Sequence, residues 1–191
     1  MKPVKIGICG LGTVGSGTVN VLVRNQREIN ARAGCQIEIA QIGARRDNPG
    51  CDTRAFNVSR DVMDVARNPD IDIVVELIGG TGLARELVLT AIRNGKHVVT
   101  ANKALIALHG NELFKEAEKA GVTVSFEAAV AGGIPIIKAL REGLAANRIQ
   151  WLAGIINGTS NFILTEMRDK GRDFADVLAE AQALGYAEAD P

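Results

Sequence analysis

Three glycines near the start of the chain have the spacing of a phosphate-binding turn. Gly10, Gly12 and Gly15 follow an apolar run, residues 4–9, and precede a segment with helical periodicity. In such a turn the first glycine permits a sharp bend, the second lets the backbone approach a pyrophosphate, and the third lets helix and strand pack closely. The N–H groups at the start of the helix favour anionic phosphates. The motif joins a strand to a helix, so it predicts a dinucleotide site, with an ordinary strand–helix turn as the alternative.

Two arginines follow the second predicted strand, where dinucleotide-binding folds usually carry an acid. That acid binds the ribose hydroxyls, whereas Arg45 and Arg46 suit the additional 2′-phosphate of NADP. Asp47 comes next and keeps NAD as an alternative cofactor. The other interpretation of the two arginines is a solvated turn with no ligand.

Lys103 and Glu188 are charged side chains that could meet a substrate. Lys103 follows a predicted buried strand whose carboxyl end should share an edge with the glycine turn. A lysine there places a cation near a reacting oxygen or the cofactor, and the alternative is a surface lysine at a helix start. Glu188 follows the predicted helix cap Gly185, and its carboxylate could receive a substrate ammonium group. On the residues alone, a solvated acidic tail explains Glu188 better.

Glu127 ends another predicted strand and precedes a small, flexible loop. The carbonyl groups of Val130, Gly132 and Ile134 follow it closely. A carboxylate with several backbone oxygens suits a hard cation. The residues alone favour the other interpretation, a hinge in which the glutamate is hydrogen-bonded.

Strand and helix patterns alternate regularly along the first two thirds of the chain. Strands are expected over residues 4–9, 37–42, 71–78, 97–100 and 122–127, with helices over 13–33, 59–68, 83–94 and 111–120. This alternation predicts right-handed crossovers and an α/β fold, a Rossmann-like doubly wound parallel sheet over residues 1–133. Residues 134–191 are expected to begin an α+β substrate and dimerisation domain, with helices over 135–146, 162–170 and 174–184 and a strand over 150–156.

Composition excludes several classes of function. The 191 residues contain 22 Lys and Arg against 22 Asp and Glu, so no net charge draws in nucleic acid or anionic membrane. No apolar run approaches the roughly 18 residues of a membrane span, and the N-terminus has no signal-peptide layout. Cys9, Cys35 and Cys51 have no CxxC spacing and are typical of reduced thiols in a cytoplasmic protein.

Five stretches together resemble homoserine dehydrogenase. They are residues 7–15, 100–107, 127–136, 154–164 and 185–191, which span the chain in the family's order. The glycine turn is shared with many dehydrogenases, whereas the other four stretches are far more specific. The resemblance implies reversible, NAD(P)-dependent conversion of L-homoserine to L-aspartate 4-semialdehyde, in the biosynthesis of threonine, methionine and isoleucine. It also implies a homodimer or tetramer for the full-length protein.

The resemblance also assigns residues. It implies a cofactor site made of Gly10, Leu11, Gly12, Thr13, Val14, Gly15, Arg45, Arg46 and Lys103. Lys103 would be the catalytic residue, on the nicotinamide side. A sodium ion would be held, chiefly through carbonyls, by Glu127, Val130, Gly132 and Ile134. Gly185 and Glu188 would bind homoserine, and the loop over residues 157–161 would line its pocket.

One departure from the family bears on activity. In the family, the tail is followed by a substrate-binding aspartate and a second lysine, the usual proton donor, and this sequence ends before both. General acid–base catalysis is worth about 10²–10⁴-fold, so we expect these 191 residues to bind cofactor with little or no turnover.

Two other functions are compatible with a glycine turn of this kind. A non-catalytic dinucleotide-binding module explains the glycine turn but gives no reason for the loop over residues 157–161. A phosphorylating semialdehyde dehydrogenase needs a nucleophilic cysteine and a histidine base, and all three cysteines fall in the nucleotide-binding half. The second function is therefore rejected.

Overall fold

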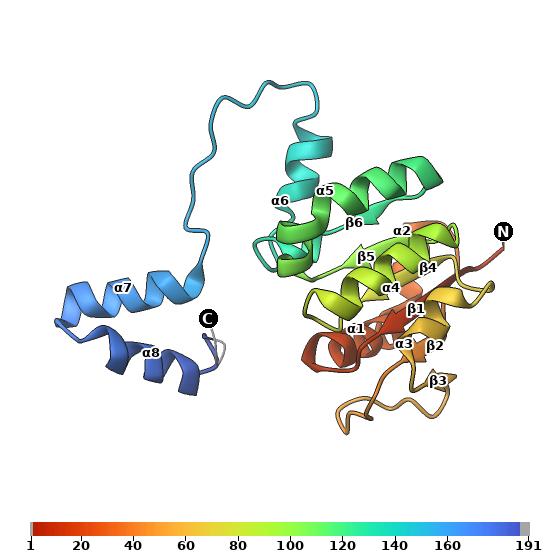
Figure 1. Cartoon of the computed structure of the whole chain (residues 1–191), viewed down its shortest axis with the longest axis horizontal. Helices are drawn as coiled ribbons and strands as arrows, with labels where there is room; N and C mark the ends of the chain where they lie inside the picture. Colours follow the sequence, from red (N-terminus) through yellow and green to blue (C-terminus); the bar gives the residue numbers. More distant parts are fainter. Residues whose placement is uncertain (1, 188–191) are drawn as a thin grey trace. The chain divides into compact units, whose positions relative to one another are not determined.

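The computed structural model describes residues 2–187 and divides into two compact units, Met1–Ala145 and Ala146–Pro191 (Figure 1). The first unit contains a six-stranded sheet in the order β3-β2-β1-β4-β5-β6, and every pairing is parallel. Its strands are β1 (Val4–Cys9), β2 (Ile37–Gly43), β3 (Val58–Ser59), β4 (Ile73–Glu76), β5 (His97–Thr100) and β6 (Val124–Ser125). The predicted Rossmann-like parallel sheet is confirmed.

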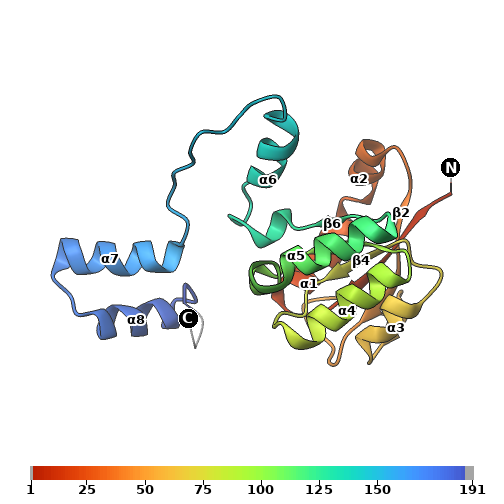
Figure 2. The same ribbon diagram turned by 45° about the horizontal axis from the view of Figure 1, so that its top comes forward.

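Helices cover both faces of this sheet (Figure 2). They are α1 (Thr13–Arg24), α2 (Gln26–Ala33), α3 (Val62–Arg67), α4 (Gly82–Arg93) and α5 (Lys103–Ala120). Helices α1 and α2 lie on one face, and α3, α4 and α5 on the other. The chain runs outward from β1 to β3 and then returns to place β4 on the other side of β1. The connections after β1 and β4 therefore diverge, and ligands of such sheets bind in the crevice between them.

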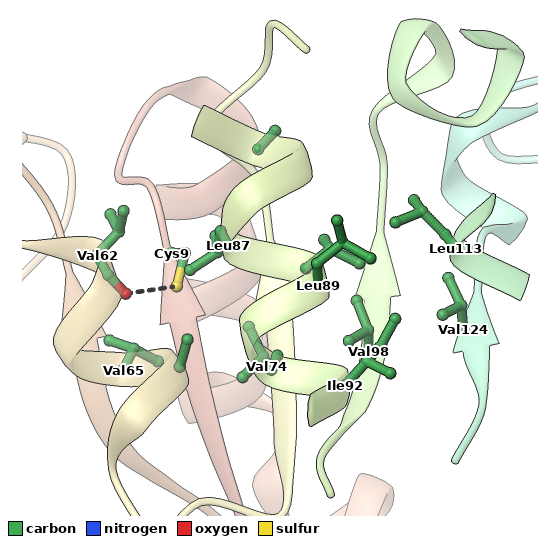
Figure 3. Packing of buried hydrophobic residues seen from close by; sticks show 14 of the residues in the cluster. Cys9, Val62, Val65, Val74, Leu87, Leu89, Ile92, Val98, Leu113 and Val124 are labelled. Carbon is green, nitrogen blue, oxygen red and sulfur yellow. Dashed lines mark hydrogen bonds between the residues drawn. The ribbon is translucent and has the colours of Figure 1, made fainter. Parts of the chain in front are cut away.

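Strand β1 is buried on both faces because its side chains alternate. Ile6 and Ile8 pack into the core on the α1 side, whereas Cys9 belongs to the core on the α3 side. The Cys9 thiol donates to the carbonyl oxygen of Val62 at 3.9 Å (Figure 3). A Cβ on Gly7 would lie 2.3 Å from Val65 Cγ1, so the close approach of α3 to β1 requires this glycine.

The core on the α3–α5 side joins four neighbouring strands, β1, β4, β5 and β6, to the helices packed on them (Figure 3). Its strand residues include Val74, Val98 and Val124, and its helix residues include Leu87, Ile92 and Leu113. Leu87 is fully buried. The second core, on the α1 side, is built from β1, β2, β4 and α1 with the loops that follow β1 and β2.

Lys96 is a buried cation at the opposite end of the sheet from the glycine turn. Its ammonium donates to the carbonyl oxygens of Asn68 and Ile71, at 2.6 and 2.8 Å. Burial lowers the pKa of Lys96, and the nearby Asp72 and Asp70 oppose that shift. The side chain ties the end of α3 to the start of β5.

The second unit consists mainly of two helices, α7 (Gly158–Lys170) and α8 (Phe174–Ala183). Its buried core is Ile163, Val177 and Ala181. The rings of Phe162 and Tyr186 meet edge to face, with 5.3 Å between centroids. None of the helices within residues 2–187 is both long and apolar enough to cross a membrane.

Several predicted elements were wrong in detail within the first unit. The helix expected over residues 13–33 breaks at Asn25, whose backbone leaves the helical region, so two helices form. Helix α3 is capped by Asp61, which accepts from Met63 N at 2.9 Å, because Ser59 belongs to the unpredicted strand β3. The strand expected over 122–127 is shortened to β6, and a 3₁₀ turn, Glu127–Ala129, follows it.

The region after residue 134 differs more. The helix expected over 135–146 is a short α6 (Ile136–Lys138) continued by a π-helical turn, Ala139–Gly143. The strand expected over 150–156 is not formed, and Trp151 and Ile156 are 79% and 89% exposed. A strand needs a neighbour to satisfy its backbone, and residues 2–187 provide none for this segment. The predicted domain boundary at 133/134 remains a prediction.

Candidate dinucleotide-binding site

The glycine turn lies between the end of β1 and the start of α1, and its three glycines have different surroundings. Gly10 has φ +105°, and a Cβ there would lie 2.5 Å from the carbonyl oxygen of Leu77. A Cβ on Gly15 would lie 2.0 Å from the carbonyl oxygen of Gly10. Around a Cβ on Gly12, by contrast, no atom lies within 4 Å. Gly10 and Gly15 are therefore required by packing, whereas Gly12 faces open space of the kind that an approaching pyrophosphate needs.

The first turn of α1 is suited to an anion. Gly12 is its N-cap and provides no side-chain hydrogen bond, and the first turn contains no acidic residue. Thr13 and Val14 are exposed, whereas Leu11 is buried and its carbonyl accepts from Asn48 Nδ2 at 2.8 Å. Backbone N–H groups at a helix start, without a capping side chain, favour phosphate oxygens. These residues thus fit a dinucleotide.

The end of β2 carries the charges that would meet the adenosine ribose. Arg45 and Arg46 are exposed immediately after the strand. Arg60, which sequence reasoning missed, donates to the Ala44 carbonyl at 3.3 Å and pairs with the Asp47 carboxylate at 3.0 Å. Strand β3 brings Arg60 here, because Ser59 lies in register with Gly43. That strand has two residues, so its sequence signal is too short to recognise.

Lys103 is the first residue of α5 and is exposed. Asn102 precedes it as the N-cap, and its Oδ1 accepts from Leu105 N at 3.0 Å. The Asn102 side-chain amide also donates to the Gly80 carbonyl at 2.6 Å, which joins the loop after β5 to the loop after β4. Lys103 thus lies at the carboxyl edge of the sheet, as predicted, on a helix start held by two hydrogen bonds.

Glu76 is a second residue that sequence reasoning missed. It ends β4 with 0% exposure, and its carboxylate accepts from Ile78 N at 2.9 Å and from the Thr100 hydroxyl at 2.5 Å. An acid inside the apolar run over residues 73–78, just before two glycines, was the available signal. Burial, reinforced by the charge of Glu76, raises the pKa of the Cys9 thiol, which argues against a nucleophilic role for Cys9.

The loop proposed for a cation gives a mixed result. The Glu127 carboxylate accepts from the N–H groups of Ile137 and Lys138, at 3.0 and 2.8 Å, so it caps the short helix α6. These bonds agree with the hydrogen-bonded glutamate of the other interpretation. No group of three or more His, Cys, Asp and Glu side chains in the described residues could hold a metal. A cation here would therefore depend on the backbone carbonyls of Val130, Gly132 and Ile134.

The residues expected to bind substrate belong to the second unit. Asn157 caps α7 by accepting from Ser160 N at 2.7 Å, and the Thr159 hydroxyl donates to the Tyr186 carbonyl. These bonds bring the loop over 157–161 to the segment that follows α8. Gly185 has φ +74°, and Glu188 lies outside the described residues.

A parallel sheet in this strand order, with a glycine turn beside its switch point, defines a dinucleotide-binding domain of the Rossmann class. Residues 10–127 match the family described as "Homoserine dehydrogenase, NAD binding domain", and residues 135–191 match "Homoserine dehydrogenase". The chain belongs to the homoserine dehydrogenase family.

Individual relatives of known sequence and structure support the same family assignment. The chain is 75% identical over 191 residues to homoserine dehydrogenase of Pseudomonas aeruginosa, covering 100% of this chain and 44% of that protein. A crystal structure of a homoserine dehydrogenase from Thiobacillus denitrificans matches with 62% identity and a TM-score of 0.91, over 100% of this chain and 44% of that one. A hyperthermophilic archaeal homoserine dehydrogenase in complex with NADPH matches with 27% identity and a TM-score of 0.81, covering 100% of this chain and 64% of that one. The chain spans less than half the length of the Pseudomonas aeruginosa protein and of the Thiobacillus denitrificans protein.

Proposed function

We propose that this chain binds NADP(H) or NAD(H) within a protein that interconverts L-homoserine and L-aspartate 4-semialdehyde. The observation that carries the proposal is the open space over Gly12, between two glycines that packing requires. The relatives are homoserine dehydrogenases, which supports homoserine as one of the two substrates. On this proposal the protein acts in the biosynthesis of threonine, methionine and isoleucine. A homodimer or tetramer for the whole protein is part of the proposal, as is a cytoplasmic location, which the three free cysteines support.

We infer NADP as the preferred cofactor. Arg45 and Arg46 are exposed at the end of β2, where a 2′-phosphate would find two guanidinium groups. Asp47 could instead have accepted from ribose hydroxyls, but its carboxylate is paired with Arg60. The pyrophosphate would rest on the backbone of Leu11, Thr13 and Val14. NAD remains the alternative that the binding experiment below decides.

Catalysis on this proposal divides between cofactor and protein. The nicotinamide, when bound, supplies the hydride acceptor or donor. Lys103 places its ammonium at the carboxyl edge of the sheet, where it would stabilise the charge that develops on the substrate oxygen. Gly185 and Glu188 would hold the amino-acid end of homoserine, because a carboxylate pairs with an ammonium group.

We also propose a sodium site in the loop that follows Glu127. The carbonyls of Val130, Gly132 and Ile134 are hard oxygen ligands, and Ala131 and Gly133 adopt positive φ, so the loop is tightly curved. The Glu127 carboxylate is already bonded to α6, so this residue would contribute its own carbonyl. A higher melting temperature in sodium chloride than in choline chloride at equal ionic strength would support the site. Equal melting temperatures would contradict it.

The decisive experiment titrates the chain with NADPH and NADH by fluorescence and assays homoserine oxidation on the same sample. We expect tighter binding of NADPH, and little or no turnover by these residues alone. Arg45→Ala should cost about tenfold in NADPH affinity with little change for NADH, because a charge-assisted hydrogen bond to phosphate is lost. Arg168→Ala, at an exposed arginine of α7, is the matched control and should change neither affinity. Failure to bind either cofactor would overturn the proposal.

A further inference from the structure

Glu76 occupies an unusual place for a carboxylate. It is completely buried at the carboxyl end of β4, where it lies in register with Cys9 on one side and Thr100 on the other. Glutamate is almost never fully buried unless its oxygens have partners. These partners come from the connections that follow β4 and β5.

The hydrogen bonds of Glu76 form part of a closed ring. One oxygen accepts from the N–H groups of Ile78 and Gly79, at 2.9 and 3.3 Å, in the loop after β4. The other accepts from the Thr100 hydroxyl, whose oxygen in turn accepts from Asn102 N at 3.0 Å. The Asn102 side chain then donates back to the first loop, at the Gly80 carbonyl. The ring joins the two loops immediately before Lys103.

The loop after β4, which is part of this ring, also contacts the glycine turn. Leu77 N donates to the Cys9 carbonyl at 2.8 Å, directly before the turn begins. The Leu77 carbonyl approaches Gly10 so closely that a Cβ there would lie 2.5 Å away. A shift of the loop after β4 would therefore displace the pyrophosphate end of the site as well.

We propose that Glu76 is a positioning residue of the cofactor site, which acts through Thr100 and Asn102 to fix the start of α5 and so Lys103. The inference rests on the proposed function, because it assigns Lys103 to the cofactor. Three donors converge on one side chain, and only a carboxylate offers two acceptor oxygens and no donor. A glutamine would present amide hydrogens to the Thr100 hydroxyl or to the N–H groups of the loop. A purely structural role would satisfy the same bonds without any effect on Lys103.

A double-mutant cycle separates positioning from structure. Thr100→Val removes the hydroxyl with little change of shape, and we expect the NADPH dissociation constant to rise about fivefold, the equivalent of one lost hydrogen bond. Thr100→Ser keeps the hydroxyl and should stay within about twofold of the unaltered chain. In a Lys103→Ala background, Thr100→Val should cost less NADPH affinity than in the unaltered chain, because only its effect on the glycine turn remains. Ile92→Val, a buried change in α4 away from both loops, is the control and should leave NADPH affinity unchanged.

Three results would overturn the inference while leaving cofactor binding intact. The first is an equal loss on Thr100→Val with and without Lys103. The second is unchanged NADPH affinity in Lys103→Ala. The third is unchanged amide exchange at Gly79 and Asn102 in Glu76→Gln, for which we expect at least about tenfold faster exchange. Failure of the unaltered chain to bind NADPH would instead overturn the proposed function itself, and the Glu76 assignment with it.

Discussion

The two units of this chain use similar local signals and reach different degrees of burial. Helices α5 and α7 both begin at an asparagine cap and end at a left-handed glycine. In the first unit, helices on both faces cover a parallel sheet and bury two extensive cores. In the second, the buried core among residues 146–187 is three side chains. Capping and periodicity are therefore enough to start and stop helices, whereas cooperative stability depends on how much apolar surface is covered.

The largest expected effect comes from truncating the larger core. Leu87→Ala should lower the free energy of unfolding of the first unit by about 3 kcal/mol, because a fully buried leucine leaves a cavity. Val177→Ala, also fully buried, should destabilise only the second unit. Urea unfolding with amide exchange by NMR would follow the two units separately. A matching loss in both units for either variant would mean that they unfold as one.

The glycine turn gives the next largest effect and separates packing from binding. Gly15→Ala forces a Cβ against the Gly10 carbonyl and should lower the free energy of unfolding by about 2 kcal/mol. The same substitution should also weaken NADPH binding. A Cβ on Gly12 would meet no atom within 4 Å, and the backbone of Gly12 has φ −67°, so Gly12→Ala should leave the free energy of unfolding unchanged. The NADPH affinity should fall at least tenfold, because the added methyl group removes roughly one close contact between backbone and pyrophosphate. Melting temperature and fluorescence titration report the two quantities. If Gly12→Ala bound NADPH normally, the pyrophosphate would not lie where we propose.

Helix caps offer a smaller, matched comparison. Asn157→Ala removes the cap of α7 and should cost the second unit about 1 kcal/mol. Asn102→Ala removes the cap of α5 and also the bond to the Gly80 carbonyl, so the first unit should lose more. Amide exchange within each helix would measure both losses. Equal losses would show that the bond to Gly80 adds nothing to stability.

Lowering the pH should give the smallest effect on stability. Hydrogen bonds from Arg85 lower the pKa of Glu112 between α4 and α5, and those from Lys170 and Arg172 lower the pKa of Glu166 in the second unit. The folded pKa lies below the unfolded value of 4.5, so each pair stabilises above that pH and the contribution is lost as pH falls through the lowered pKa. Amide exchange at falling pH should show the second unit loosening first, since its core is smaller. Earlier loosening of α4 and α5 would contradict this order.

Much of the sheet was predictable because its signals are local. The apolar run of β1, the three glycines and Gly121 after α5 each mark a boundary by residue type alone. The break at Asn25 and the two-residue strand β3 were not predictable, since a single backbone torsion or one lateral pairing decides each. The strand expected over 150–156 failed because apolar periodicity cannot supply a neighbouring strand.

The site was predictable in the same uneven way. The position of Lys103 at the carboxyl edge of the sheet follows from its place after a buried strand, whereas its catalytic role stays a prediction. The contacts of Arg60 and Glu76 do not follow from sequence, because one reaches Asp47 from 13 residues away and the other bonds to Thr100 from 24 residues away. Such partners are set by the packing of the sheet rather than by neighbours in sequence. Cofactor contacts of Arg45 and Arg46 remain predictions.

The buried amine of Lys96 offers a chemical measure of local opening in the first unit. Its amine is enclosed, with both carbonyl partners in the segment that leads from α3 to β4, whereas Lys103 is exposed. An amine-acylating reagent should therefore modify Lys103 at once and Lys96 only when that segment detaches. The rate at which Lys96 is acylated, followed by mass spectrometry, would report how often the end of the sheet farthest from the glycine turn comes apart.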